Sequence, residues 1–103
     1  MPKAQLYFEQ RLVLENGLLR DIKVWKVPVT LKYPDGVRYH LVLVNPVSGK
    51  VLLLFDNHYP KGHHRHDRDD NESEYSYSNM TTLIQDYLKF ETQEIRKNEN
   101  NED

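Results

Sequence analysis

The sequence predicts an α+β fold: an antiparallel sheet of four to five strands, arranged as a meander, with one long C-terminal helix packed on one face. Runs of aliphatic and β-branched residues alternate with turn sequences in the first half of the chain, as in a sheet of short strands. One later segment has the periodicity of an amphipathic helix. At 103 residues, we expect a single domain at 1–97, followed by a disordered acidic tail at 98–103 that contains no apolar residue.

The first two expected strands form a hairpin. Residues 6–14 and 18–27 are rich in aliphatic and aromatic side chains, and Asn16-Gly17 lies between them. Asparagine and glycine accept the positive φ angles that tight hairpin turns require. Pro28 cannot donate a hydrogen bond to a sheet, and a Pro-Asp-Gly turn follows it, so residues 28–36 connect the hairpin to the next strand.

Two further strands are expected at 37–44 and 51–55, which consist largely of aliphatic and β-branched residues. The six residues between them have the composition of a hairpin loop. Residues 56–72 contain almost no aliphatic side chain, so we expect a long loop there. Residues 74–77 are a candidate edge strand, and for this reason the expected number of strands is four to five.

The helix is expected after Ser78 or Asn79, because either side chain can accept a backbone N–H bond as an N-cap. The pattern ends near Arg96. Apolar residues recur at helical spacing along one face; they are Met80, Leu83, Ile84, Tyr87 and Leu88. We expect this face to pack on the sheet.

Composition limits the chemistry that the protein can perform. The chain has no cysteine, which excludes disulfides, thiolate zinc sites and thiol nucleophiles. No segment approaches the roughly 20 apolar residues that span a bilayer, and the first residues lack the apolar region of a secretion signal. We therefore expect a cytoplasmic protein with no membrane partner and no cofactor.

The net charge of −2 conceals an asymmetry along the chain. Residues 1–68 contain 11 Lys and Arg against 6 Asp and Glu, whereas residues 69–103 contain 3 against 10. A basic body can attract polyanions such as nucleic acid. The alternative is that the solvated faces of the protein differ in the sign of their charge without any role in binding.

The histidine-rich segment after the fourth expected strand is the candidate site. Lys61 supplies a positive charge, Gly62 allows the backbone to approach an anion, and Arg65 offers a fork that matches two phosphate oxygens. For RNA the nucleophile can be the adjacent 2′-hydroxyl, so cleavage requires no metal. The groups that titrate near neutrality and can transfer the protons are His58, His63, His64 and His66.

Two other interpretations of this segment stay open. Imidazoles bind zinc, copper and nickel, and His64-x-His66 would point two rings to one side of an extended segment. Residues 58–66 hold Lys61 and Arg65 but no carboxylate, which disfavours a dication unless the acidic residues of 67–72 fold back. The segment could also be a solvated turn without function.

Two aromatic residues in the expected strands are interpreted as structural. Trp25 is a lone tryptophan in a strand and is expected to pack, and His40 lies within an aliphatic strand. Asp56, at the end of the fourth strand, either orients a histidine or caps a turn.

The sequence resembles the TumE-type toxins of bacterial and archaeal toxin–antitoxin pairs. The resemblance rests on Asp56-Asn57 and on the block Lys61-Gly62-His63-His64-Arg65-His66, preceded by the Ile22–Pro28 strand and by a strand that contains Tyr39. It implies a growth-inhibiting toxin encoded beside a helix-turn-helix antitoxin, and many such toxins are ribonucleases. The motif positions that carry over are Trp25, Asp56, Asn57, Lys61, Gly62, His64, Arg65 and His66, together with His63.

These observations lead to the hypothesis of a type II toxin that acts as a metal-independent endoribonuclease. Lys61 and Arg65 would hold the scissile phosphate, with Asp56, Asn57 and Gly62 completing the substrate site. Two of the four histidines would serve as general base and acid. The expected partners are the antitoxin, RNA and, as a candidate, a second copy of the chain. A non-catalytic binding module and a metal-binding protein are the alternatives.

Overall fold

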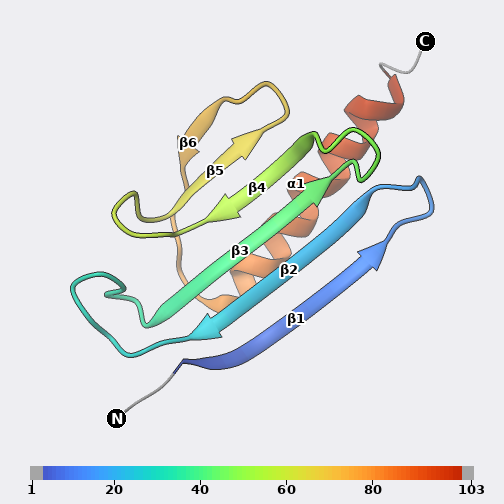
Figure 1. The fold of residues 1–103 in the computed structure, drawn as a ribbon. Coiled ribbons are helices and arrows are strands. Elements are labelled where there is room, and N and C mark those ends of the chain that lie inside the picture. Colours follow the sequence, from blue (N-terminus) through green and yellow to red (C-terminus); the bar gives the residue numbers. More distant parts are fainter. Residues whose placement is uncertain (1–3, 101–103) are drawn as a thin grey trace.

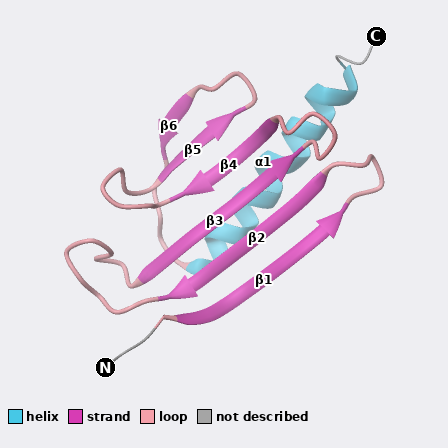
Figure 2. Ribbon diagram, viewed as in Figure 1, coloured by secondary structure: helices cyan, strands magenta, loops and turns pink. Residues whose placement is uncertain are grey.

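A computed structural model describes residues 4–100 of the chain. Its strands lie side by side in the order of the sequence, and one helix crosses a single face of the sheet (Figure 1). Every neighbouring pair of strands is antiparallel. The elements are β1 (Gln5–Val13), β2 (Leu19–Lys26), β3 (Val37–Val44), β4 (Val51–Asp56), β5 (His64–Asp67), β6 (Glu72–Glu74) and α1 (Met80–Asn100). The predicted α+β meander with a C-terminal helix is confirmed (Figure 2).

The predicted number of strands was too low: the described residues form six strands and not four to five. The difference lies in residues 56–72, which were expected to be a loop but contain β5 and the start of β6. β5 has no aliphatic residue, yet its backbone pairs with β4. On its inner face the Arg65 guanidinium lies 4.3 Å from the centroid of the Phe90 ring. This contact between a cation and an aromatic ring stabilises β5 against the helix. A strand prediction based on apolar residues does not find it.

The predicted Asn-Gly hairpin between β1 and β2 is confirmed. The N–H of Leu14 donates to the Leu18 carbonyl at 2.8 Å, and the N–H of Gly17 donates to the Leu14 carbonyl at 2.9 Å. Gly17 has a φ of +86°, a left-handed conformation that costs other residues roughly 1–2 kcal/mol. This turn places Gln10 opposite Ile22.

The core lies between the sheet and α1. Ile22 of β2, Leu41 of β3 and Phe55 of β4 are buried on the same face of the sheet, because their positions are opposite one another in the strand register. Leu83 and Tyr87 of α1 are buried against them. The predicted packing of the apolar helix face is confirmed for these two residues.

Two buried ion pairs also connect α1 to the sheet. Arg20 of β2 donates from Nε to Oε2 of Glu91 at 2.9 Å, and Glu91 is only 3% exposed. Arg68, in the turn after β5, donates from Nε to Oε2 of Glu94 at 3.0 Å. Part of the acidic charge of the C-terminal region is therefore internal and is neutralised by arginines from the first 68 residues.

The helix begins as predicted and extends further than predicted. Oδ1 of Asn79 accepts the N–H of Thr82 at 2.8 Å, as an N-cap does. α1 ends at Asn100 and not near Arg96, so residues 98–100 of the expected tail are helical, and residues 101–103 lie outside the described range. In the part of the chain that the structure describes, no helix has the length and apolar character needed to span a bilayer.

The acidic stretch after β5 forms the turn to β6. Oδ1 of Asp67 accepts the N–H groups of Asp69 at 2.9 Å and of Asn71 at 3.0 Å. Partial burial raises the pKa of Asp67, but these hydrogen bonds outweigh it and lower the pKa below the usual value. The Asp67 carboxylate thus shapes the turn.

Candidate functional site

The face of the sheet opposite α1 carries polar side chains from the central strands. Successive side chains of a strand point to opposite faces, so the burial of Val24 and Leu41 against α1 directs Lys23, Trp25 and His40 to the open face. The fold thus separates an apolar face from a polar one on the same strands.

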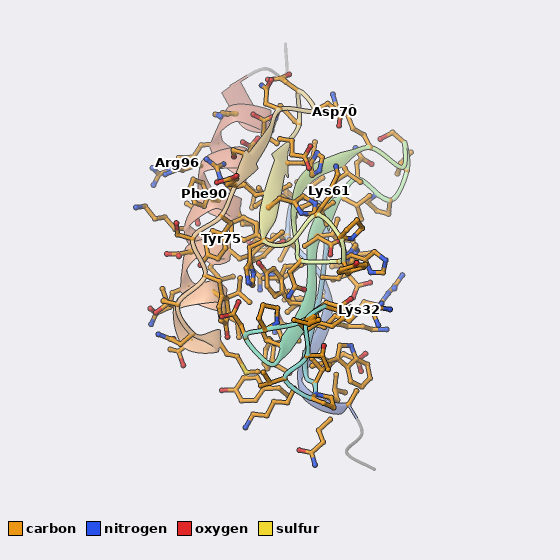
Figure 3. All side chains as sticks on the ribbon, turned by 90° about the vertical axis from the view of Figure 1, so that its left-hand side faces the viewer. Lys32, Lys61, Asp70, Tyr75, Phe90 and Arg96 are labelled. Atoms are coloured by element: carbon orange, nitrogen blue, oxygen red, sulfur yellow. The ribbon has the colours of Figure 1, made fainter. Side chains whose placement is uncertain are left out.

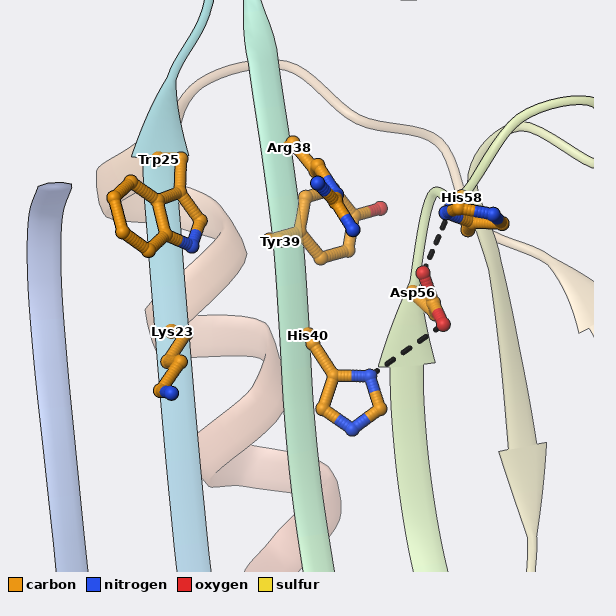
Figure 4. Close-up of a pocket in the computed structure, with 7 residues that line it drawn as sticks. All are labelled: Lys23, Trp25, Arg38, Tyr39, His40, Asp56 and His58. Atoms are coloured by element: carbon orange, nitrogen blue, oxygen red, sulfur yellow. Dashed lines mark hydrogen bonds and ion pairs between the residues drawn. The ribbon is translucent and has the colours of Figure 1, made fainter. Parts of the chain in front are cut away.

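A pocket of about 370 Å³ lies on this open face (Figure 4). Its volume falls within the range of about 300–1,000 Å³ that is usual for small-molecule sites. The residues that line it come from β2, from β3 and from the end of β4 with the loop after it, and they are Lys23, Trp25, Arg38, Tyr39, His40, Asp56 and His58.

The strand register brings these residues together. Lys23 of β2 is opposite His40 of β3, and His40 is opposite Asp56 of β4. In the neighbouring row, Trp25 is opposite Arg38. Directly opposed residues have Cβ atoms about 4.5–5.5 Å apart, so residues from three strands form one polar surface.

Asp56 is the fixed anion of this surface. Its Oδ2 lies 3.5 Å from Nδ1 of His40, and its Oδ1 accepts the backbone N–H of His58 at 2.8 Å. Burial raises the pKa of Asp56, but the hydrogen bonds from the His40 ring and the His58 backbone outweigh it and lower the pKa below the usual value. An ionised Asp56 directs Nδ1–H of His40 toward itself, which leaves Nε2 as the proton acceptor of that ring.

Two cations and an indole complete the pocket. Lys23 and Arg38 are both exposed, and Trp25, which lines the pocket with them, is half-buried. Lys23 also lies 3.5 Å from Glu9 of β1, but both side chains are about half exposed, so water weakens that pair. The pocket can therefore attract an anion while offering a ring face for stacking.

A second polar cluster, which we call the edge cluster, lies on β5 and β6, adjacent to the pocket. Its members are His64, His66, Glu72 and Lys61. Lys61 Nζ lies 2.7 Å from Oε1 of Glu72, and Nε2 of His66 and of His64 lie 3.6 and 3.9 Å from the same oxygen. His64 is also opposite Asp56 in the register, so the two groups share the open face.

His63 is held apart from both groups. Its Nε2 lies 2.7 Å from Oδ2 of Asp35, and its Nδ1 lies 2.8 Å from the hydroxyl of Tyr39. Burial raises the pKa of Tyr39, so its hydroxyl keeps its proton in this hydrogen bond. The ring also stacks on Tyr77 with centroids 4.9 Å apart. Both nitrogens of His63 are thus already engaged.

Two of the predicted substrate-binding residues point inward. Asn57 is 4% exposed; its Oδ1 accepts the N–H of Tyr39 at 2.9 Å, and its Nδ2 donates to the Val37 carbonyl at 2.8 Å. Arg65 packs on Phe90, which belongs to the helix layer in the side view of Figure 3, whereas Lys61 lies in the sheet layer. Asn57 and Arg65 therefore support the fold around the site.

Gly62 contributes through its backbone. It has a φ of +74°, and its carbonyl accepts a hydrogen bond from Nδ1 of His64 at 2.9 Å. The glycine thus allows the turn that fixes the orientation of the His64 ring.

The structure therefore divides the residues predicted from sequence. Asp56 and His58 line the pocket, and so does Trp25, which was expected to pack. Lys61, His64 and His66 form the edge cluster with Glu72. Asn57, Gly62, His63 and Arg65 lie outside both groups. Sequence reasoning did not place His40, Lys23 and Arg38 in the site. A short signal for them was present: polar residues two positions apart on consecutive strands, Asp21 and Lys23 on one and Arg38 and His40 on the next, indicate a sheet face that is not part of the core.

The molecule is thus a small α+β protein with a histidine-containing polar pocket on an open sheet face. A family model described as Toxin TumE matches residues 2–95, so the chain belongs to this toxin family, as its sequence suggested. No curated protein and no solved structure matches the chain.

Proposed function

We propose that this chain is the toxin of a type II toxin–antitoxin system and that it acts as an endoribonuclease. The observation that carries the proposal is the composition of the pocket: two cations, an indole and two histidines, one of them beside an ionised aspartate. Phosphate binding needs the cations, and proton transfer near neutral pH needs the histidines.

The proposed reaction uses His40 as the general base and His58 as the general acid. Nε2 of His40 takes the proton of a 2′-hydroxyl, and the 2′-oxygen attacks the adjacent phosphorus. The bond from phosphorus to the 5′-oxygen breaks, and the His58 imidazolium gives its proton to that oxygen. The products are a 2′,3′-cyclic phosphate and a 5′-hydroxyl, and no metal takes part.

Lys23, Arg38 and Trp25 have supporting roles in this proposal. The ammonium and the guanidinium hold the phosphate and stabilise the negative charge that develops on it. The indole is available for stacking on a base next to the cleaved bond, an interaction worth about 1–3 kcal/mol per base. Asp56 orients His40 and is a positioning residue.

The proposed partner is an antitoxin with a helix-turn-helix domain, encoded beside the toxin. Membership of a toxin family implies an antitoxin in general. Whether this antitoxin has a helix-turn-helix domain is tested by the sequence of the neighbouring reading frame and by co-purification of the toxin with the protein that this frame encodes. A neighbouring frame without such a domain would contradict it.

Cleavage of RNA by the purified protein in EDTA is the direct test. The wild type should produce fragments with cyclic phosphate ends, and His40→Ala and His58→Ala should each lower the rate by about 10²–10⁴. Lys89→Ala, on the exposed surface of α1, is the matched control and should retain the wild-type rate. Cleavage that disappears in EDTA would contradict the metal-independent mechanism.

The alternative is a binding module without catalysis. It predicts RNA binding by the same pocket and no turnover of RNA by the wild type. Cleavage that persists in His40→Ala but is lost in His66→Ala would instead move the reaction to the edge cluster. Growth of cells that express each variant from an inducible promoter should follow the same ranking as cleavage.

A further inference from the structure

The edge cluster contains three side chains whose metal-binding atoms converge. A ring nitrogen of His64, a ring nitrogen of His66 and a carboxylate oxygen of Glu72 all lie within 4.8 Å of one another. The histidines are two positions apart on β5 and therefore share a face, and Glu72 of β6 is opposite His66 in the register. Backbone pairing thus brings the three ligands together without any loop rearrangement.

The orientation of His64 is already that of a metal ligand. Its Nδ1 lies 2.9 Å from the Gly62 carbonyl, and a carbonyl can only accept, so Nδ1 carries the proton. In the neutral ring Nε2 then has the free electron pair, and it is the nitrogen that faces Glu72 at 3.9 Å. Metal-binding histidines characteristically donate their other N–H to a carbonyl or carboxylate in this way. His64 is only 8% exposed, so the ring is held in this position.

Local charge favours a cation more than the sequence suggested. In the sequence, two cations and no carboxylate lie within residues 58–66. In the structure, Arg65 faces α1, and Glu72 approaches from β6. The remaining cation, Lys61, lies 2.7 Å from Glu72, so this carboxylate already pairs with a positive charge.

We propose that His64, His66 and Glu72 form a binding site for a divalent transition metal such as Zn²⁺, Ni²⁺ or Co²⁺. Two imidazoles and a carboxylate suit these ions, and three protein ligands leave a fourth position for water. Ligands at about 2.0–2.1 Å in a tetrahedral site are about 3.3 Å apart. The distances from Glu72 to the two histidines, 3.6 and 3.9 Å, require only a small contraction, and the two ring nitrogens lie within 4.8 Å of each other. The metal displaces Lys61 as the partner of Glu72.

Titration of the full chain without a histidine tag, using ZnCl₂ and NiCl₂ in a calorimeter, tests the site. The wild type should bind one ion per chain, and Co²⁺ should give the intense visible absorption of a tetrahedral complex. Loss of a residue that only orients a ligand typically weakens metal binding by about 10- to 100-fold. His66→Ala and Glu72→Gln each remove a ligand itself and should weaken binding by more than this. Lys61→Met should tighten it by about fivefold or more, because it removes a competing charge.

His63→Ala is the matched control, because it removes a neighbouring imidazole that lies outside the edge cluster, and it should leave the affinity unchanged. Circular dichroism of each variant establishes that it is folded. Binding of Zn²⁺ should also raise the melting temperature of the wild type but not that of Glu72→Gln. Absence of saturable binding by the wild type, or equal binding by His66→Ala, would overturn the proposal and leave the edge cluster as an ion-pair network.

This site goes beyond the proposed nuclease function, and the two are tested separately. Metal titration contains no RNA, and the cleavage assay contains EDTA. A protein that binds Zn²⁺ but does not cleave RNA would support the metal site and contradict the nuclease, and the reverse result would do the opposite.

Discussion

Asp56 is the residue on which the pocket depends. It accepts a hydrogen bond from the backbone N–H of His58 and lies beside the ring of His40, so one carboxylate contacts both residues of the proposed acid–base pair. A carboxylate in this position holds an imidazole in one tautomer and stabilises it when it is protonated. Replacing Asp56 should therefore affect stability and reactivity together.

Asp56→Asn should make the protein less sensitive to acid. The folded-state pKa of Asp56 is lowered from its ordinary value of 3.8, so its ionised form stabilises the folded state above that pH, and the stabilisation is lost as the pH falls through the folded pKa. The difference in free energy of unfolding between the wild type and Asp56→Asn should be present at pH 7 and shrink below a pH of about 3.8. Urea unfolding at a series of pH values measures it. A difference that does not depend on pH would contradict this role.

At the scale of elements, α1 is held on the sheet by apolar contacts and by two arginine–glutamate pairs. In the first of these, the side chains of Arg20 and Glu91 are 18% and 4% exposed. Burying such a pair gives little net stability, but removing one partner leaves an uncompensated charge in the interior. The surface pair Arg11–Asp21 on neighbouring strands, whose side chains are 70% and 25% exposed, has no such penalty.

Arg20 and Glu91 should therefore be far more sensitive to mutation than the surface pair. Glu91→Ala is expected to lower the free energy of unfolding by about 3–5 kcal/mol. Arg11→Ala, the matched control, is expected to lower it by about 1 kcal/mol or less. Urea denaturation followed by circular dichroism gives both values, provided that the slopes of the two transitions agree. Equal losses in the two variants would show that the buried pair is not coupled to helix docking.

At the scale of the whole molecule, the cations of the pocket and the helix lie on opposite faces of the sheet. The cations of the pocket, Lys23 and Arg38, lie on the open face, whereas α1, which carries four Asp and Glu against three Lys and Arg, lies on the other (Figure 1). An RNA strand that approaches the open face is separated from the helix by the sheet. The negative net charge is therefore compatible with binding of a polyanion on one side.

Binding of single-stranded RNA should weaken with salt in proportion to the phosphates contacted. Each cation removed from the interface should reduce the slope of log affinity against log salt by about 0.7, so Lys23→Ala and Arg38→Ala should each produce this change. Fluorescence anisotropy, in a His40→Ala background that prevents cleavage, measures the slopes. Lys89→Ala on α1 serves as the control and should leave the slope unchanged. An equal reduction of the slope by this control would show that the RNA does not bind specifically at the open face.

Much of the fold is predictable because it depends on local signals. The Asn16-Gly17 turn, the aliphatic strands β3 and β4 and the Asn79 cap all appear in the sequence as short patterns with direct conformational causes. β5 could not be predicted in this way. Its inner residue, Arg65, is stabilised by Phe90 from α1, and a contact between residues so distant in sequence leaves no periodic signal.

For the site, the available chemistry could be predicted from the amino-acid sequence alone: a cysteine-free chain with a block of histidines, lysine and arginine after a buried strand, in a recognisable toxin family. Which of these groups lie together depended on the three-dimensional fold. Register across β2, β3 and β4 placed His40 beside Asp56, and pairing of β5 with β6 brought Glu72 to His64 and His66. Strand pairing brings together side chains that are far apart in the chain. Alternation along a strand places neighbours such as His64 and Arg65 on opposite faces.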